Sequence, residues 1–185
     1  HGAAAQIAAL GEKRSVPLSN VDGTGVTDEA TLEVSMDAIS RLSNSIMQSL
    51  TTVKVQAASA NAIHAHPAGI IGGVDAGLTG IVERIDAEVL KGFLDQDILP
   101  VVPPLGFDAD GQTLRVNSDS VAREVAVALG ASKILFVSVD DPRSTLERGQ
   151  RTWSSENVIE FLGDADSLPP GLASKLKHGA AATRD

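Results

Sequence analysis

The sequence of 185 residues contains no cysteine. Disulfide bonds, thiolate metal sites and a cysteine nucleophile are therefore excluded. Aromatic residues make up only 3% of the chain, so alanine, valine, isoleucine and leucine must build its core. A core of small aliphatic side chains favours helices packed closely on a sheet over a barrel or sandwich rich in large rings.

Positive charge is also scarce, with 15 lysines and arginines against 24 acidic residues and a formal net charge of −9. An acidic protein repels the phosphate backbone, so nucleic acid is not an expected partner. No basic cluster suggests a membrane surface, and no apolar run approaches the roughly 20 residues that a transmembrane helix needs. With no signal-peptide pattern visible, we predict a cytoplasmic protein.

Histidines offer only weak grounds for a metal site. His64 and His66 flank one residue, a spacing that a strand could use to bind a metal. No acidic or histidine partner stands nearby at helical spacing, so a structural role is the better interpretation. No metal site is predicted.

Helical patterns begin and end at recognisable residues. The first is predicted to end at Gly11, and a longer helix opens at Thr27, which is expected to cap it. A separate short helix is expected over residues 44–50. Asp86 is predicted to cap a helix that reaches Asp95.

Strand patterns lie between these helices. Gly80–Ile85 alternates as a strand does, whereas Ile98–Val102 and Lys133–Val139 are continuous apolar runs typical of buried parallel strands. The glycine-rich stretch Ala68–Gly80 suits a hairpin or a ligand-covering flap. The alternation predicts an α/β fold, a three-layer sandwich in which helices cover a mainly parallel central sheet. Ligands are then expected at the carboxyl ends of the strands.

The two ends of the sequence suggest a fragment. The chain starts His1-Gly2 with no methionine, which is typical of a turn that follows a strand. The stretch after Gly179 has no helix-terminating signal. We expect one domain over residues 1–185, with its first strand and its C-terminal part missing.

A series of short motifs follows one another in a fixed order. They are His1–Ile7, Val26–Val34, Gly80–Asp86, Leu99–Gly106, Asp110–Gln112, Val116–Asp119 and Val121–Leu135. In this order they resemble the amino-acid kinase family over nearly the whole chain. The resemblance implies an amino-acid kinase fold, and two branches of the family are similar: acetylglutamate kinases and the kinase-like domain of N-acetylglutamate synthases.

Departures from the kinase pattern favour the synthase branch. Kinases have an arginine before the Val-Thr-Asp stretch that grips a substrate carboxylate, and here that place is Gly25. They have an asparagine two residues before the Asn117 position, and here it is Arg115. At the glycine loop, Gly2 is followed by Ala3, Ala4 and Ala5 at the next expected small positions, and the loss of glycine there reduces close backbone approach to phosphate.

The resemblance also implies candidate site residues. Gly2, Asn117, Asp119 and Lys175 fall on ligand-binding positions, and Asp119 and Lys175 would be the catalytic pair in a kinase. For Asp119, capping of the following helix is the favoured alternative. Lys175 equally suits a solvated basic patch with Lys177 and His178.

The synthase interpretation implies a regulatory and oligomerisation domain of an enzyme of arginine biosynthesis. The full-length acetyltransferase would use acetyl-CoA and L-glutamate, L-arginine would be an allosteric effector, and the protein would be a homo-oligomer. This domain alone would hold no cofactor and is not expected to catalyse. The alternative, an acetylglutamate kinase, implies ATP with Mg²⁺, and a kinase for another acidic amino acid also stays open.

Overall fold

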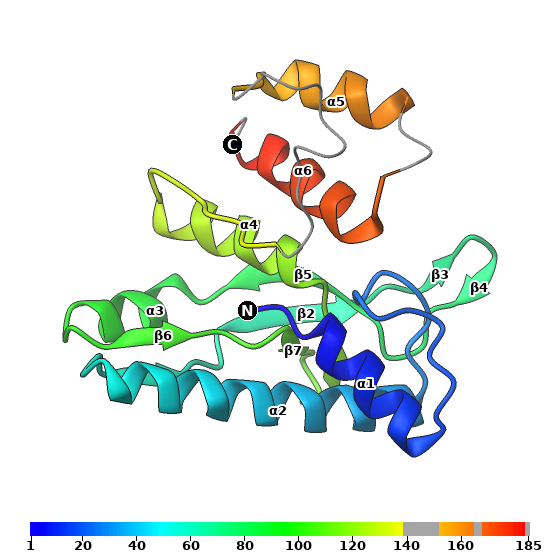
Figure 1. The fold of residues 1–185 in the computed structure, drawn as a ribbon, viewed down its shortest axis with the longest axis horizontal. Helices are drawn as coiled ribbons and strands as arrows, with labels where there is room; N and C mark the ends of the chain where they lie inside the picture. The colour runs from blue at the N-terminus through cyan, green and yellow to red at the C-terminus, as the bar shows by residue number, and fades with distance from the viewer. Residues whose placement is uncertain (139–151, 165–167, 184–185) are drawn as a thin grey trace. The chain divides into compact units, whose positions relative to one another are not determined.

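The computed structural model describes residues 1–138, 152–164 and 168–183. The chain divides into two compact units, His1–Val121 and Ala122–Asp185, and each is described by itself. Figure 1 gives the element labels used below. No helix in the described part is long and apolar enough to cross a membrane.

Helices of the first unit begin at well-defined caps. They are α1 (Ala4–Arg14), α2 (Glu29–Thr52), α3 (Ala87–Leu94) and the first turn of α4 (Ser118–Leu129), which continues into the second unit. Asp28 caps α2 by accepting a hydrogen bond from the backbone N–H of Thr31 at 2.7 Å. Asp86 caps α3 in the same way, as predicted, by accepting from the N–H of Val89 at 3.3 Å.

Strands of the first unit form three sheets. They are β1 (Ala57–Ser59), β2 (Ile63–Pro67), β3 (Ile70–Ile71), β4 (Val74–Asp75), β5 (Gly80–Ile85), β6 (Leu99–Val101), β7 (Leu105–Phe107) and β8 (Thr113–Arg115). Pairing is parallel for β1–β6 and β2–β7, and antiparallel for β2–β5, β7–β8 and β3–β4. The order β5-β2-β7-β8 forms a four-stranded sheet. The α/β class is confirmed, with more antiparallel pairing among the described strands than expected.

Short connections account for that antiparallel pairing, because only antiparallel neighbours can be joined by a tight turn. The β3–β4 hairpin turns at Gly72 and Gly73, both with positive φ (58° and 84°). This conformation suits a two-residue hairpin turn and is open to glycine at little steric cost. The predicted hairpin in this glycine-rich stretch is therefore confirmed.

The core of the first unit lies between α1 and α2. Ala3 and Ile7 pack with Val34, Ala38 and Ile39, all almost fully buried. α2 also lies against β1 and β8, and α3 lies against β6 (Figure 1). Small aliphatic side chains build this contact, as the scarcity of aromatic residues predicted.

Several predicted boundaries are wrong. Gly11 does not end α1 but lies inside it, because the helix needs a residue without a side chain against Leu18, whose Cδ1 would come within 2.6 Å of a Cβ. The separate helix predicted over residues 44–50 is part of α2. The predicted strand Lys133–Val139 is absent from its described part, residues 133–138, where no neighbouring strand pairs with the backbone.

In its described residues, the second unit holds two further helices. They are α5 (Ser155–Asp164) and α6 (Pro170–Ala182), which contact each other. The rings of Trp153 and Phe161 meet edge to face, with centroids 5.0 Å apart. Trp153 is half-buried and packs against Phe161 of α5.

Candidate functional site

A candidate site forms where β8 ends and α4 begins. Arg115 is the last residue of β8, and Ser118 is the first of α4. The loop from Ser19 to Val26 contacts this junction through hydrogen bonds to Arg115 and Asn117. Gly2, ahead of α1, contacts it through Ser118. Residues from three distant parts of the sequence therefore meet here.

Asn117 connects the loop to the helix. Its Nδ2 donates a hydrogen bond to the carbonyl oxygen of Asp22 at 3.0 Å. Its Oδ1 accepts from the backbone N–H of Asp119 at 3.1 Å and of Ser120 at 2.9 Å, which caps α4. The prediction that Asp119 provides the cap is wrong, because Asn117 accepts from the N–H groups at this helix end. An amide has both a donor and an acceptor, so Asn117 also holds the loop to the helix.

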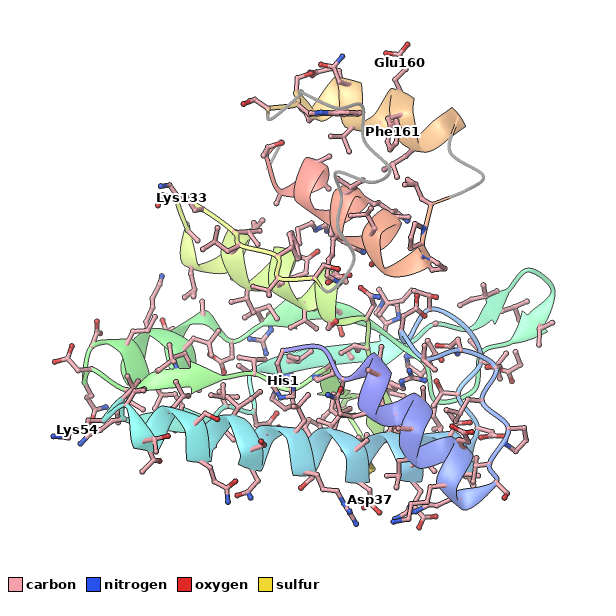
Figure 2. The ribbon with its side chains drawn as sticks, viewed as in Figure 1. His1, Asp37, Lys54, Lys133, Glu160 and Phe161 are labelled. Carbon is pink, nitrogen blue, oxygen red and sulfur yellow. The ribbon has the colours of Figure 1, made fainter. Side chains whose placement is uncertain are left out.

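Gly2 lies against the start of α4. A Cβ on Gly2 would stand 3.0 Å from Oγ of Ser118. Beside it, the backbone nitrogen of His1 donates to the carbonyl oxygen of Val102 at 3.1 Å (His1 is labelled in Figure 2). Gly2, Asn117 and Asp119 are thus brought together around one helix end.

Arg115 is the most unusual group of the site. The residue is only 2% exposed, and its Nη1 donates to the carbonyl oxygen of Asn20 at 3.2 Å. Its Nη2 is buried and has no hydrogen-bond partner among the residues that the structure describes. Burial lowers the pKa of the guanidinium, and the Asp22 carboxylate partly offsets this effect. A buried guanidinium is usually stabilised by a carboxylate in direct contact, which Arg115 lacks within residues 1–138.

A buried pair of hydroxyl groups holds the far end of the loop. Oγ1 of Thr79 lies 2.5 Å from the carbonyl oxygen of Gly25 and 2.7 Å from Oγ1 of Thr27. Because each hydroxyl has one hydrogen, Thr79 donates to the carbonyl and accepts from Thr27. Thr27, predicted as a helix cap, instead belongs to this network, and Asp28 is the cap.

Lys175 lies in the second unit. It is on α6, where its Nζ donates to the carbonyl oxygen of Gly171, one helical turn earlier, at 3.4 Å. The structure therefore brings together three of the four predicted site residues and describes the fourth within the other unit.

The side chains at the junction suit recognition of an anion. Arg115 supplies a positive charge that makes no ion pair within residues 1–138, and it donates to a carbonyl oxygen of the loop. Phosphate binding at the α4 N-terminus is less favoured, because Asn117 already occupies the N–H groups of Asp119 and Ser120. In the described ranges, no group of three acidic, histidine or cysteine side chains is placed to hold a metal ion.

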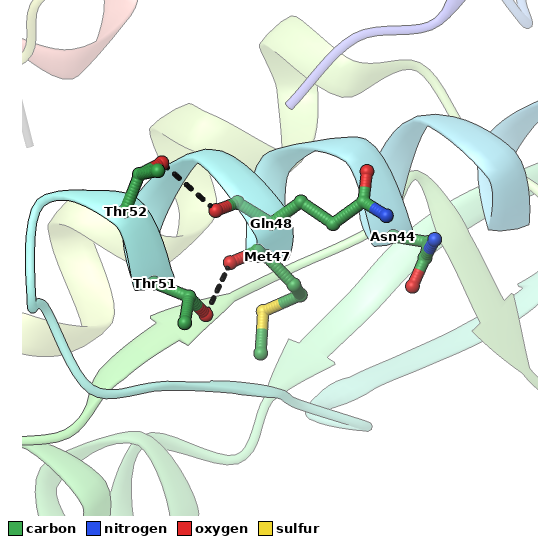
Figure 3. A pocket seen from close by; sticks show the side chains of 5 residues that line it. All are labelled: Asn44, Met47, Gln48, Thr51 and Thr52. Carbon is green, nitrogen blue, oxygen red and sulfur yellow. Dashed lines mark hydrogen bonds between the residues drawn. The ribbon is translucent and has the colours of Figure 1, made fainter.

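A pocket elsewhere does not offer comparable chemistry. It lies on the C-terminal half of α2 and is lined by Asn44, Met47, Gln48, Thr51 and Thr52 (Figure 3). The Thr51 and Thr52 hydroxyls bond to carbonyls of their own helix, at Met47 and Gln48. With no charged or titratable side chain in this set, the pocket is not our candidate.

The sequence interpretation missed three contributors. Asp22, Thr79 and the ligand-binding potential of Arg115 were not identified, and Arg115 was counted only as a departure from the kinase pattern. One signal was available for Arg115, since it stands between the apolar Leu114 and Val116. An arginine inside an apolar strand is uncommon unless it is paired or binds a ligand.

Comparison with known proteins identifies the family. The profile described as "Amino acid kinase family" matches residues 1–142. An amino-acid acetyltransferase of Ralstonia nicotianae is 31% identical over 194 residues, which cover 100% of this chain and 43% of that protein. An acetylglutamate kinase of Acinetobacter baylyi is 32% identical over 177 residues, which cover 86% of this chain and 58% of the kinase. The chain thus spans less than half of the acetyltransferase's length.

Solved structures show the same fold. N-acetylglutamate synthase of Neisseria gonorrhoeae, in complex with coenzyme A and N-acetyl-glutamate, superposes with a TM-score of 0.84 at 23% identity. The same enzyme with coenzyme A and L-arginine gives a TM-score of 0.80 at 21% identity. The match covers 100% of this chain and 43% and 45% of the two synthase chains, respectively. The predicted amino-acid kinase fold is confirmed, and the chain belongs to the amino acid kinase family.

Proposed function

We propose that this chain is the kinase-like domain of a cytoplasmic N-acetylglutamate synthase, with regulatory and oligomerising roles. The full-length enzyme would transfer an acetyl group from acetyl-CoA to L-glutamate in arginine biosynthesis. The similarity to an amino-acid acetyltransferase extends over all of this chain but less than half of that relative. We assign catalysis to the remainder of such an enzyme, and residues 1–185 to one non-catalytic domain.

The observation that carries this proposal is the state of the α4 N-terminus. The N–H groups of Asp119 and Ser120 are bonded to Asn117, and Gly25 offers no side chain to a substrate. Phosphoryl transfer relies on donors and cations that stabilise charge on the transferred group. Because these N–H groups are already bonded, this helix end has fewer donors for a transferred phosphoryl group, which counts against a kinase.

L-arginine is proposed as the effector of this domain. The Neisseria synthase has been solved with L-arginine, which motivates the choice. A ligand that binds only the folded state raises the melting temperature with its concentration. Thermal unfolding of the full-length protein with L-arginine, and with D-arginine as control, tests this assignment. A shift that both enantiomers cause equally would contradict a specific site.

Acetylglutamate kinase is the second candidate, because a kinase relative is 32% identical. The two functions differ in what they consume. The full-length protein is given acetyl-CoA with L-glutamate in one assay and ATP, Mg²⁺ and N-acetyl-L-glutamate in another. Acetyl transfer without ATP use is the expected result. ATP consumption without acetyl transfer would overturn the synthase proposal.

A further inference from the structure

β2 presents two histidines on the exposed face of the four-stranded sheet. His64 and His66 are exposed, whereas the alternating residues Ile63 and Ala65 are only 3% and 2% exposed. Successive side chains of a strand point to opposite faces, so the two imidazoles share one face, with their Cα atoms about 6.6 Å apart. β2 pairs with β5 on one side and with β7 on the other. A backbone paired on both sides therefore holds the two rings next to each other.

Each histidine keeps a ring nitrogen available for a ligand. Nδ1 of His66 lies 3.0 Å from the carbonyl oxygen of Pro67. Because a carbonyl only accepts, Nδ1 carries the hydrogen, and in the neutral ring Nε2 then carries the free lone pair. Metal-binding imidazoles are usually oriented by such a bond from their second nitrogen. His64 makes no hydrogen bond to the residues that the structure describes, so its ring can turn toward the same point.

We propose that His64 and His66 chelate a divalent copper ion, with water at the remaining coordination positions. Imidazole nitrogen is a suitable donor for copper, nickel and zinc. Among these ions, Cu²⁺ forms the most stable complexes with a given set of donors, and it accepts the tetragonal arrangement of N and O ligands that two imidazoles and water provide. Structural Zn²⁺ sites take four tetrahedral ligands from the protein. Two protein donors therefore favour Cu²⁺.

The spacing of these histidines alone did not predict a metal site, because no further ligand stands nearby at helical spacing. In residues 1–138, 152–164 and 168–183, no three histidine, cysteine or acidic side chains are placed to surround one ion. Glu83, which the register shift between β2 and β5 leaves without a partner on β2, does not complete such a group. Exposure of both rings and the bond that orients His66 instead suit an open site with two protein donors.

One neighbouring charge opposes a cation at this place. Arg84 is the partner of His64 across the β2–β5 ladder, and cross-strand partners share a face. Both side chains are exposed, so solvent weakens the repulsion between Arg84 and a bound ion without removing it. Arg84→Gln removes this charge and should tighten Cu²⁺ binding about two- to fivefold, as expected for exposed charges close to each other.

The test is calorimetric titration of the full-length protein with Cu²⁺, in the presence of glycine as a competing ligand. His64→Gln and His66→Gln should each weaken one site per chain at least about tenfold, a loss that even an outer-shell change can cause at a metal site. The double variant should bind little more weakly than either single variant, because each one already abolishes chelation. Copper sites elsewhere in the full-length protein are common to all variants, so the difference from wild type assigns the site.

Two further measurements make the assignment specific. His178→Gln, which removes a histidine from α6, is the matched control and should leave the titration unchanged. Pulsed electron paramagnetic resonance detects coordinated imidazole, and wild type with less than one equivalent of Cu²⁺ should show two imidazoles where each single variant shows one. Because both substitutions lie on an exposed face, the variants should fold, and their thermal unfolding without metal checks this.

Three outcomes would overturn the proposal. Equal Cu²⁺ binding by wild type and the double variant would exclude these histidines. Two independent ions, or a loss in only one of the single variants, would mean separate imidazoles and not a chelate. Tighter binding of Zn²⁺ than of Cu²⁺ in the same titration would contradict the choice of metal. The readout requires neither acetyl nor phosphoryl transfer, so its result is independent of the function proposed above.

Discussion

The side chain of Asn117 bonds to the carbonyl oxygen of Asp22, 95 residues away in the sequence, at 3.0 Å. The same amide accepts from the N–H groups of Asp119 and Ser120 and caps α4. One side chain therefore fixes the loop and the helix relative to each other.

Replacements of Asn117 should separate its two roles. Asn117→Asp keeps an acceptor for the cap and loses the donor to Asp22, so we expect a loss of about 1 kcal/mol in the free energy of unfolding. Asn117→Ala loses both, and about 2 kcal/mol is expected. Urea denaturation at neutral pH measures the difference. Equal losses for the two variants would contradict the dual role.

The hydroxyl of Thr79 should contribute more than its size suggests. Thr79→Val keeps the shape but leaves the Gly25 carbonyl and the Thr27 hydroxyl without this partner, in a buried environment. We expect roughly 1 to 3 kcal/mol of destabilisation in urea denaturation. Thr79→Ser retains the hydroxyl and is the control. A cost for Thr79→Val no larger than that for Thr79→Ser would contradict this prediction, because valine keeps the methyl group and loses only the hydroxyl.

Local chemistry made much of the fold predictable. Asp86 stands before a helical pattern and caps α3, and Gly80–Ile85 alternates and forms β5. Gly11 misled the prediction, because a glycine is both a frequent helix stop and a frequent point of close packing. Contact with Leu18 decides between these roles, and such a contact depends on tertiary structure that local patterns do not contain.

The candidate site was predictable only in part. Asn117 and Asp119 were found through a resemblance, on one continuous motif. Arg115 was interpreted only as a departure from the substrate-binding pattern of the kinases, because its burial depends on contact with a loop that is distant in the sequence. Its hydrogen bond to Asn20 spans 95 residues, so no local pattern reveals the burial of its charge.

Two glycines should respond to alanine in opposite directions. Gly92 lies inside α3 with nothing within 4 Å of an added Cβ, so Gly92→Ala should stabilise by about 0.5 to 1 kcal/mol. Gly106 lies in β7, where a Cβ would stand 2.7 Å from the Ala65 Cβ. Gly106→Ala should therefore destabilise by about 1 to 3 kcal/mol. Thermal unfolding of both variants measures these effects. If both substitutions raise the melting temperature, the chain around β7 adjusts to the added Cβ, and the prediction for Gly106 is wrong.

The cap of α2 should give a pH-dependent contribution. Hydrogen bonding from Thr31 lowers the pKa of Asp28 below its ordinary value of 3.8. A lowered folded-state pKa means that the stabilisation is complete above 3.8 and is lost as the pH falls through the folded-state pKa. Asp28→Ala should cost about 1 kcal/mol at pH 7, and Asp28→Asn much less.

A comparison of wild type with Asp28→Asn at low pH checks the direction of this pH dependence. Asparagine keeps its acceptor at every pH, so Asp28→Asn should gain relative to wild type when urea denaturation is repeated near pH 3. An unchanged difference between pH 7 and pH 3 would mean that the charge of Asp28 contributes nothing beyond the neutral hydrogen bond.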